Sequence, residues 1–305
     1  MQSISRRVAA LLAAAGVLVS PVAAQTKQKT FATPEEAVNE LVAATKANDV
    51  KAMLAVLGAE ASSVILSGDA VDDRATYERF AKAHAEASRL ERQGDAKAIL
   101  FVGKDDWPLP FPLVKSQAGW QFDAKQGRAE VVTRRIGRNE LAVIQVMQAY
   151  VDAQVEYYER NPANDRLLHY AQKAMSGKGK RDGLYYPTKE GEPPSPLGSL
   201  FASAQAAGYQ PGEGGKPIPY HGYVYRILTG QGADAKGGAY DYVVRGKMIG
   251  GFALVAYPAV YGNSGVMTFI VNHEGVVFEK DLGSSTSGVA AKMTRFNPDS
   301  SWKRH

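Results

Sequence analysis

The chain contains no cysteine among its 305 residues. This absence excludes thiol nucleophiles, iron–sulfur ligation, redox pairs and a disulfide framework, so burial of an apolar core must stabilise the fold. Hydrophobic residues make up 45% of the chain and charged residues 22%, a balance that is typical of globular proteins and excludes wholesale disorder. At about 150 residues per domain, the length indicates roughly two domains.

Long hydrophobic runs are also scarce, and the clearest one lies at the N-terminus. Arg6 and Arg7 precede an apolar run over residues 8–19, and small residues follow up to Ala24. This pattern is typical of a secretory signal peptide, whereas a membrane span needs about 20 apolar residues. We therefore expect a signal peptide over 1–24, a flexible mature N-terminus over 25–30, and a periplasmic or secreted protein without a stable membrane span. A retained signal anchor is the alternative.

An excess of charge of one sign is missing as well. The 36 Lys and Arg residues against 31 Asp and Glu residues give a formal charge of +5, and removal of Arg6 and Arg7 leaves +3. The basic residues are scattered, so we expect no nucleic-acid partner. The sequence also lacks a phosphate loop, a nucleophile elbow and the H-E-x-x-H pattern, and its histidines lack metal-ligand spacing. We expect no cofactor, no metal ligand and no catalytic residue, and an enzyme is the less favoured class.

Residues 31–133 have the pattern of an α+β domain. Thr33 and the following Pro-Glu-Glu predict a helix start, and apolar residues recur at helical spacing to about residue 87. The apolar spacing then changes to two, which predicts three antiparallel strands between residues 97 and 123. This order, with the opening T-P-E-E-A-V and the closing G-W-Q-F-D, resembles the cone-shaped cystatin-like domains related to nuclear transport factor two.

Residues 134–305 predict a second α+β domain, joined to the first by a short basic link over 128–139. Asn139 is the expected N-cap of a long helix that stops near Asn161. One apolar stripe is predicted along this helix, made of Leu141, Ile144, Met147, Val151, Val155 and Tyr158. A Gly/Pro-rich insertion at about 177–218 comes next, and alternating residues from Tyr220 onward predict an antiparallel sheet against which the helix packs.

Three segments of this second part resemble the globular domain of bacterial type IV pilin-like proteins. They are the long helix, with Asn139-Glu140, Ala142, Ile144, Ala153-Gln154 and Tyr157, the run G-F-A-L-V-A-Y-P from Gly251, and the run G-V-M-T-F-I-V-N-H-E-G-V-V-F from Gly265. A pilin has an N-terminal apolar helix that builds the filament core, whereas this chain has a signal peptide and a separate domain. Filament assembly by the usual route is therefore not expected.

Nearly the whole exported chain is similar to the bacterial family of domains of unknown function numbered 2950. The segments that carry the resemblance include F-A-T-P-E-E-A-V from Phe31, G-K-D-D-W-P-L-P-F-P-L-V from Gly103, R-R-I-G-R-N-E-L from Arg134 and P-Y-H-G-Y from Pro219. The resemblance implies an exported protein of a bacterium of the Gram-negative type. It implies no activity.

The candidate site residues are aromatic. His221 follows Tyr220 near a strand start and is expected to share a face with Tyr223, and the insertion contributes Tyr185 and Tyr186. Aromatic rings around one imidazole can hold a sugar or a small polar ligand. The alternative is an ordinary, half-buried strand face.

These observations favour a non-enzymatic binding or assembly module of the bacterial envelope, whose partner is an envelope protein or a glycan. Two alternatives stay open. One is a hydrolase or lyase that uses His221 or His84 with a carboxylate. The other is an accessory pilin-like subunit of a secretion or pilus system.

Overall fold

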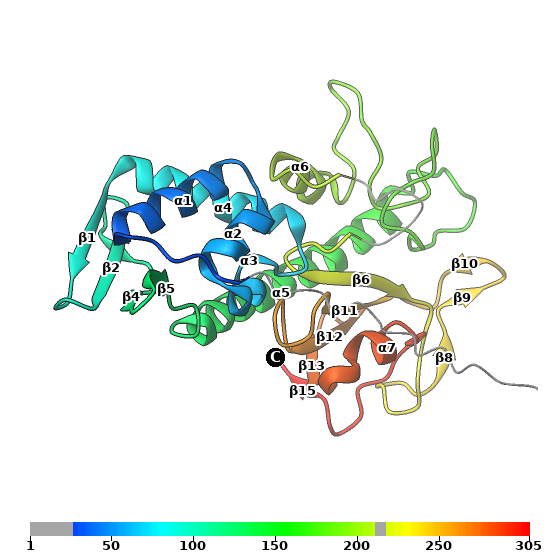
Figure 1. Cartoon of the computed structure of the whole chain (residues 1–305). Helices are drawn as coiled ribbons and strands as arrows, with labels where there is room; N and C mark the ends of the chain where they lie inside the picture. The colour runs from blue at the N-terminus through cyan, green and yellow to red at the C-terminus, as the bar shows by residue number, and fades with distance from the viewer. Residues whose placement is uncertain (1–26, 211–217) are drawn as a thin grey trace, which may run out of the picture.

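The computed structural model describes residues 27–210 and 218–305, which form an α+β protein with two sheet-containing halves along one long helix (Figure 1). The signal peptide predicted over 1–24 lies outside the described residues. Of the segment expected to be flexible, Gln28 is held in place, because its Nε2 donates to the carbonyls of Val56 at 3.1 Å and Phe122 at 2.8 Å. Within the described ranges, no helix combines the length and the apolar character that a membrane crossing needs.

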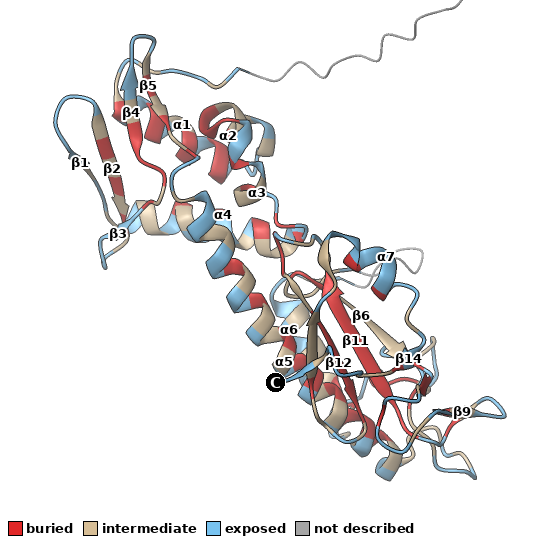
Figure 2. Cartoon of the chain, turned by 90° about the horizontal axis from the view of Figure 1, so that it is seen from below, coloured by how far each residue is buried: buried red, intermediate tan, exposed pale blue. Residues whose placement is uncertain are grey.

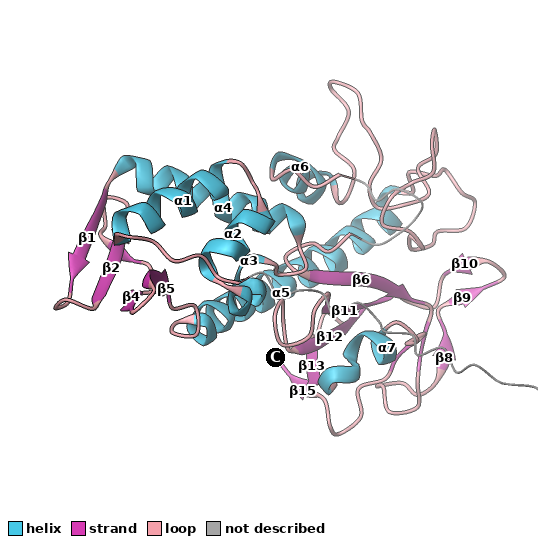
Figure 3. Cartoon of the chain, in the orientation of Figure 1, coloured by secondary structure: helices cyan, strands magenta, loops and turns pink. Residues whose placement is uncertain are grey.

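In the N-terminal half, helices precede an antiparallel sheet (Figure 3). Thr33 caps the first helix as expected, because its Oγ1 accepts from the Glu36 N–H at 3.2 Å. The strands lie in the order β1-β2-β4-β5, with β3 also paired to β2. The elements are α1 (Pro34–Lys46), α2 (Val50–Leu57), α3 (Ser62–Ile65), α4 (Ala70–Glu86), β1 (Ser88–Arg92), β2 (Lys97–Val102), β3 (Trp107–Pro108), β4 (Leu113–Ser116) and β5 (Gly119–Phe122).

The long helix α5 (Arg128–Arg160) extends through both halves of the molecule. It includes residues 128–139, for which a short link between domains was predicted. Residues 128–139 form its first turns, so the prediction of a separate link is wrong, and the boundary predicted at 133/134 falls inside the helix. Asn139 is not an N-cap. It is buried in the helix interior, where its Nδ2 donates to the Ser264 carbonyl at 2.9 Å.

The buried face of α5 differs by one residue from the predicted stripe at several positions. Leu141 and Val155 are 63% and 43% exposed, whereas Met147 is buried as predicted. The residues that face the C-terminal sheet are Val143, Met147, Tyr150, Ala153 and Tyr157. Apolar residues also lie next to the buried face of α5. The apolar spacing alone therefore does not show which of two adjacent apolar residues is buried.

The C-terminal half is a five-stranded antiparallel sheet that packs against α5 (Figures 1 and 2). The expected hairpin is confirmed: β12 and β13 pair around the turn at Asn272–Gly275. Figure 2 shows that buried residues fill β11 and β12 at the centre of this sheet. The strand order is β15-β13-β12-β11-β6, with β6 (Tyr223–Leu228), β11 (Ala253–Pro258), β12 (Met267–Asn272), β13 (Phe278–Asp281) and β15 (Lys303–Arg304).

Shorter elements complete this half. Helix α6 (Gly198–Ala206) lies within the Gly/Pro-rich insertion, and α7 (Thr286–Ala290) contacts β11. The short strands are β7 (Gly230–Gln231), β8 (Tyr240–Asp241), β9 (Val243–Val244), β10 (Lys247–Met248) and β14 (Arg295–Phe296). Single turns of 3-10 helix cover Ala59–Ala61 and Gly283–Ser285.

Buried polar residues join the two halves. Asp69, at the start of α4, is 2% exposed, and its Oδ2 accepts from the Tyr209 hydroxyl at 2.7 Å and from the Gly222 N–H at 3.0 Å. Arg135 of α5 donates to Asn263 Oδ1 at 2.9 Å and to the Ser63 carbonyl at 2.8 Å. The halves therefore meet through a hydrogen-bonded interface rather than through a flexible link.

Candidate functional site

The N-terminal half contains an apolar cavity of about 170 Å³. Residues of α1, α2, α4 and the segment between β3 and β4 form its walls, among them Leu41, Met53, Leu57, Tyr77, Phe80 and Leu109. The Tyr77 hydroxyl donates to the Ile65 carbonyl, and burial raises the pKa of Tyr77 to about 12. This hydroxyl is therefore neutral and already bonded, so it adds no charge to the cavity.

A second hollow, of about 240 Å³, adjoins this cavity between α4 and the first turns of α5. Both hollows are lined by Thr76, Trp107, Pro110 and Val131, so these four residues lie at the boundary between them. The indole of Trp107 is at the surface, with 47% exposure of the residue. The apolar cavity is thus bordered on this side by a more polar mouth.

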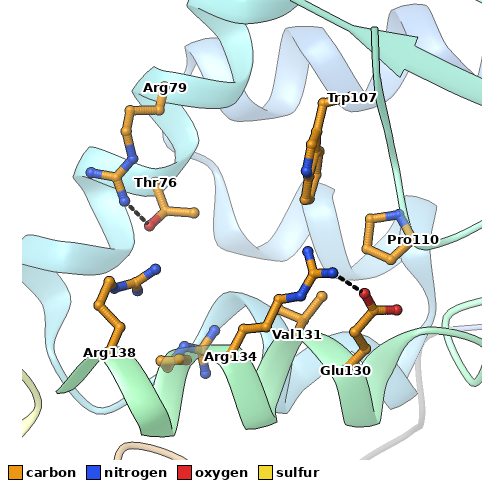
Figure 4. A pocket seen from close by; sticks show the side chains of 9 residues that line it. Thr76, Arg79, Trp107, Pro110, Glu130, Val131, Arg134 and Arg138 are labelled. Carbon is orange, nitrogen blue, oxygen red and sulfur yellow. Dashed lines mark hydrogen bonds and ion pairs between the residues drawn. The ribbon is translucent and has the colours of Figure 1, made fainter. Parts of the chain in front are cut away.

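Four arginines line the mouth: Arg79 from α4 and Arg134, Arg135 and Arg138 from α5 (Figure 4). On α5, Arg134 and Arg138 are four residues apart, so they share one helix face. Arg79 and Arg138 both approach Asp72, at 3.6 and 3.5 Å. Because they share one carboxylate, their charge is only partly neutralised.

Arg134 has an acidic neighbour in the mouth itself. Its Nη2 lies 2.5 Å from Glu130 Oε1, one helical turn earlier, and both side chains are more than half exposed. Figure 4 shows the guanidinium of Arg134 directed toward Glu130, close to Trp107. An exposed pair of this kind contributes about 0–1 kcal/mol, so an incoming anion can compete with Glu130 for the guanidinium.

Arg135 holds the start of α5 in place beside the mouth. It is 6% exposed, and its hydrogen bonds to α3 and to Asn263 fix the position of this part of α5. Burial lowers the pKa of Arg135, and the nearby Asp73 opposes that effect. Burial also raises the pKa of Asp73, although Ser67 and Arg135 stabilise its charged form. We interpret Arg135 as a structural cation and the other three arginines as available for a ligand.

The arrangement is suited to holding a molecule with an apolar body and an anionic group. Guanidinium groups bind carboxylates and phosphates through paired N–H donors, and the cavity behind them accepts apolar groups. Among the residues that line the two hollows there is no histidine, and the one carboxylate, Glu130, is paired with Arg134.

Comparison with known proteins assigns the chain to a family. Residues 28–305 match the family described as protein of unknown function (DUF2950). The chain belongs to this family. The DUF2950 match extends over both halves, so the arginine-lined mouth and the C-terminal sheet belong to one family unit. No curated protein and no solved structure matches the chain significantly.

The aromatic residues predicted as a site in this DUF2950 chain fall into two groups. The first group lies near the interface between the halves. The ring centroid of Tyr220 lies 4.2 Å from that of His221 and 5.0 Å from that of Tyr209. His221 lies in a turn with φ of +51°, before β6 begins at Tyr223. It therefore does not alternate with Tyr223 and Tyr225 along a strand, and that expectation is wrong.

The residues around His221 are buried or half-buried, and this burial shifts their pKa values. Tyr223 is completely buried, and its hydroxyl donates to the Met267 carbonyl at 2.9 Å. Burial lowers the pKa of His221, and the nearby Asp69 and Asp72 raise it less. Burial likewise raises the pKa of Tyr220. Tyr223 is thus a core residue, whereas Tyr220 and His221 belong to the packing between the halves.

The second group lies in the insertion. Tyr185 stacks on Phe201 of α6, with ring centroids 4.3 Å apart, and Tyr186 is 5% exposed beneath the guanidinium of Arg181. Among the described aromatic contacts, the ring of His221 meets only that of Tyr220. These contacts join Tyr185 and Tyr186 to α6 and Arg181 rather than to His221.

His84, the other histidine considered for catalysis, lies on α4 beside Phe80, with ring centroids 6.4 Å apart. Burial lowers its pKa, and Lys46 contributes to the same shift. In the described ranges no carboxylate pairs with His84 or with His221. The pairs of acid and base that the enzyme alternative needs are therefore not formed.

The sequence interpretation missed the arginine mouth. Its signal was present in Arg134 and Arg138, whose spacing of four puts them on one face once the helix is known to begin at Arg128. Because residues 128–139 were predicted as a link, this helical spacing was not considered. Arg79 and Trp107 join them only because the fold brings α4 and β3 to the same hollow as α5, which no local pattern predicts.

Proposed function

We propose that this protein binds an amphipathic organic anion in its N-terminal half. The observation that carries the proposal is the junction of an apolar cavity with an arginine-lined mouth through four shared residues. The apolar part of the ligand would lie in the cavity, and its carboxylate, sulfonate or phosphate would meet Arg79, Arg134 and Arg138. Such a division of polar and apolar contacts is the usual design of a small-molecule site.

The volume of the cavity limits the apolar part. A buried cavity of about 150 Å³ is known to accept one benzene molecule, so the 170 Å³ available here suits a chain or ring of about six to eight carbon atoms. A longer chain must extend past Trp107 into solvent. We therefore expect a short-chain or aromatic acid rather than a diacyl lipid.

The remaining parts of the proposal rest on the sequence. We propose export to the periplasm or the exterior through the leader over 1–24, a cystatin-like cone as the fold around the cavity, and a pilin-like origin for the C-terminal half. The C-terminal half would then present the protein to an envelope protein or a glycan, as a binding or assembly module. We do not propose the hydrolase or lyase, because His84 and His221 lack a paired carboxylate in the described ranges.

Calorimetric titration with a series of n-alkyl carboxylates tests the function. Each methylene buried adds about 0.8 kcal/mol, so the dissociation constant should fall about four-fold per carbon until the cavity is full, near six to eight carbons. The corresponding alcohols should bind at least about ten-fold more weakly, because they lack the charge that the arginines bind. Affinity that is equal for acids and alcohols, or that does not depend on chain length, contradicts the proposal.

Variants locate the binding in the site described. Arg134→Gln with Arg138→Gln should weaken binding of the carboxylates about ten-fold or more and leave that of the alcohols unchanged. Val131→Phe should fill space where the two hollows meet and weaken both series. Arg160→Gln is the matched control, because Arg160 forms the same spacing-of-four pair with Glu156 at the other end of α5. If Arg160→Gln and the double variant bind the carboxylates with equal affinity, the arginine mouth is not part of the binding site.

A further inference from the structure

The outermost strand of the N-terminal sheet has one open edge. Strand β1 is last in the order β1-β2-β4-β5, and among the described strands it pairs with β2 alone. Figures 1 and 2 both place it at the outer rim of the N-terminal half. Four of its residues are exposed, and Leu90 is half-buried. None of them lines a hollow of the proposed ligand site, so this edge is independent of the proposed function.

The pairing of β1 with β2 uses the backbone groups of alternate residues. Just before β1, the Gly103 N–H donates to the Ala87 carbonyl at 2.9 Å. Just after it, the Gln93 N–H donates to the Lys97 carbonyl at 2.8 Å. The odd-numbered residues therefore bond to β2, and the even-numbered ones direct their N–H and carbonyl groups to the open edge. This outward set is Ser88, Leu90 and Arg92. Within residues 27–210 and 218–305 these outward groups have no hydrogen-bond partner, so in a single chain only water can satisfy them.

A base and an acid lie between the outward groups. Arg89 and Glu91 are two residues apart in β1, so both side chains are on the same face of the sheet. Arg89 Nη1 donates to Glu91 Oε2 at 2.8 Å, and its Nε donates to Asp106 Oδ1 at 3.1 Å. The two side chains of this pair are 45% and 48% exposed. Leu90 lies on the opposite face and packs against the apolar core.

The order S-R-L-E-R makes this edge complementary to itself. In an antiparallel pair with Leu90 opposite Leu90 of a second copy, Arg89 of each copy lies opposite Glu91 of the other. Moving the copy by one residue leaves the outward backbone groups unmatched. Moving it by two residues, or pairing the strands parallel and in register, puts like charges opposite each other, which is unfavourable. Charges on an edge strand usually prevent pairing, whereas here they favour one register.

We propose that two copies of this chain form a two-fold symmetric dimer through antiparallel pairing of their β1 edges. Ser88 pairs with Arg92 of the other copy, Leu90 pairs with Leu90, and each such pair exchanges both N–H···O bonds. The opposed Arg89 and Glu91 form the closer, non-hydrogen-bonded pairs, with Cα atoms about 4.5 Å apart. The two Leu90 side chains meet at the centre and extend the apolar core across the axis. Each copy uses the same surface, so the assembly closes at two copies.

Analytical ultracentrifugation of the purified protein tests the proposal. At low ionic strength, where charge pairs are screened least, the average mass should rise toward twice that of one chain between about 1 µM and 1 mM. A mass that stays at one chain up to about 1 mM overturns the proposal. Neither result bears on ligand binding, because β1 lines no part of that site.

Charge reversal identifies the edge and its register. Arg89→Glu and Glu91→Arg each put like charges opposite each other twice, so each should raise the dissociation constant of the dimer about ten-fold or more. An equimolar mixture of the two variants should dimerise again, because the acids of one chain then oppose the bases of the other. Two variants that each dimerise within two-fold of the parent, or a mixture of folded variants that stays monomeric, would overturn the proposal.

Two further variants serve as control and as safeguard. Lys236→Glu is the matched control, because it reverses an exposed charge paired with Glu274 in the C-terminal half, and it should dimerise like the parent. Should Arg89→Glu fail to fold without its contact to Asp106, Ser88→Pro decides the matter. It removes an outward N–H at the first position of an edge strand, where proline is tolerated, and the preceding Ala87 is extended, as proline requires. Ser88→Pro that dimerises within two-fold of the parent would overturn the proposal.

Discussion

For the anion that we propose as ligand, single side chains should set the affinity of the arginine mouth. Glu130 occupies Arg134 in the absence of ligand, at 2.5 Å. Glu130→Gln removes this competing carboxylate and its repulsion of an incoming anion, so an n-alkyl carboxylate should bind about three-fold more tightly, as expected from an exposed pair of about 0.2–1 kcal/mol. Calorimetry measures the change. Glu156→Gln, the equivalent change at the far end of α5, should have no effect, and weaker binding in Glu130→Gln would contradict our view of the mouth.

His221 makes stability depend on pH at the residue scale. Burial lowers its pKa in the folded protein, so the unfolded chain takes up a proton first as the pH falls below about 6.5. The free energy of unfolding should therefore decrease between about pH 6.5 and the lowered pKa. His221→Asn should remove that part of the decrease, since Asn tolerates the positive φ at this position.

Urea denaturation at several pH values measures this slope for the parent protein and for His221→Asn. Burial also lowers the pKa values of His84 and His273, so the free energy of unfolding of His221→Asn will still depend on pH. The informative quantity is the difference between the two proteins, which should be largest below about pH 6.5. Parallel curves would show that His221 gains its proton equally in the folded and unfolded chains.

At the scale of one element, α5 determines where the site is. It provides three arginines of the mouth near its start and the buried face for the C-terminal sheet further along. Gly137 lies inside this helix, and a Cβ at that position would meet no atom within 4 Å. Glycine in a helix interior costs about 0.5–1 kcal/mol relative to alanine.

Gly137→Ala should therefore raise the free energy of unfolding by about 0.5–1 kcal/mol without changing ligand affinity. Thermal denaturation monitored by circular dichroism measures the gain. Gly222→Ala is the opposite control, because its Cβ would lie 2.6 Å from Asn139 Nδ2 and its φ is +72°, so it should destabilise the protein. Loss of stability in Gly137→Ala would mean that the helix bends at this residue in solution.

In the whole molecule, Arg135 is one of the buried polar residues that connect the halves. Its donors reach Ser63 and Asn263, and the carbonyl of Val64 accepts a further bond. Arg135→Met leaves these buried acceptors without a partner, so it should lower the free energy of unfolding by about 3 kcal/mol. Arg134→Met, with an exposed side chain, should change it by less than about 0.5 kcal/mol.

Urea titration of both variants checks this difference. Tryptophan fluorescence reports on Trp107 and Trp120 in the N-terminal half and on Trp302 in the C-terminal half. Because Asp69, Arg135 and α5 connect the halves, we expect one cooperative transition in the parent protein. A second transition in Arg135→Met would show that the halves unfold separately once this connection is removed. Unchanged stability in Arg135→Met would mean that its hydrogen bonds contribute nothing net.

The α+β class, the Thr33 cap, the β12–β13 hairpin and the family could be predicted from the residues alone, because these depend on local turn chemistry, periodicity and short motifs. Which apolar face of α5 is buried, that residues 128–139 are helical, and which charges meet all depend on the packing of distant segments. Arg79, Trp107 and Arg138 lie far apart in the sequence, as do Asp165 and Lys247. Packing of separate elements brings each set together, and no short-range pattern of residues contains that information.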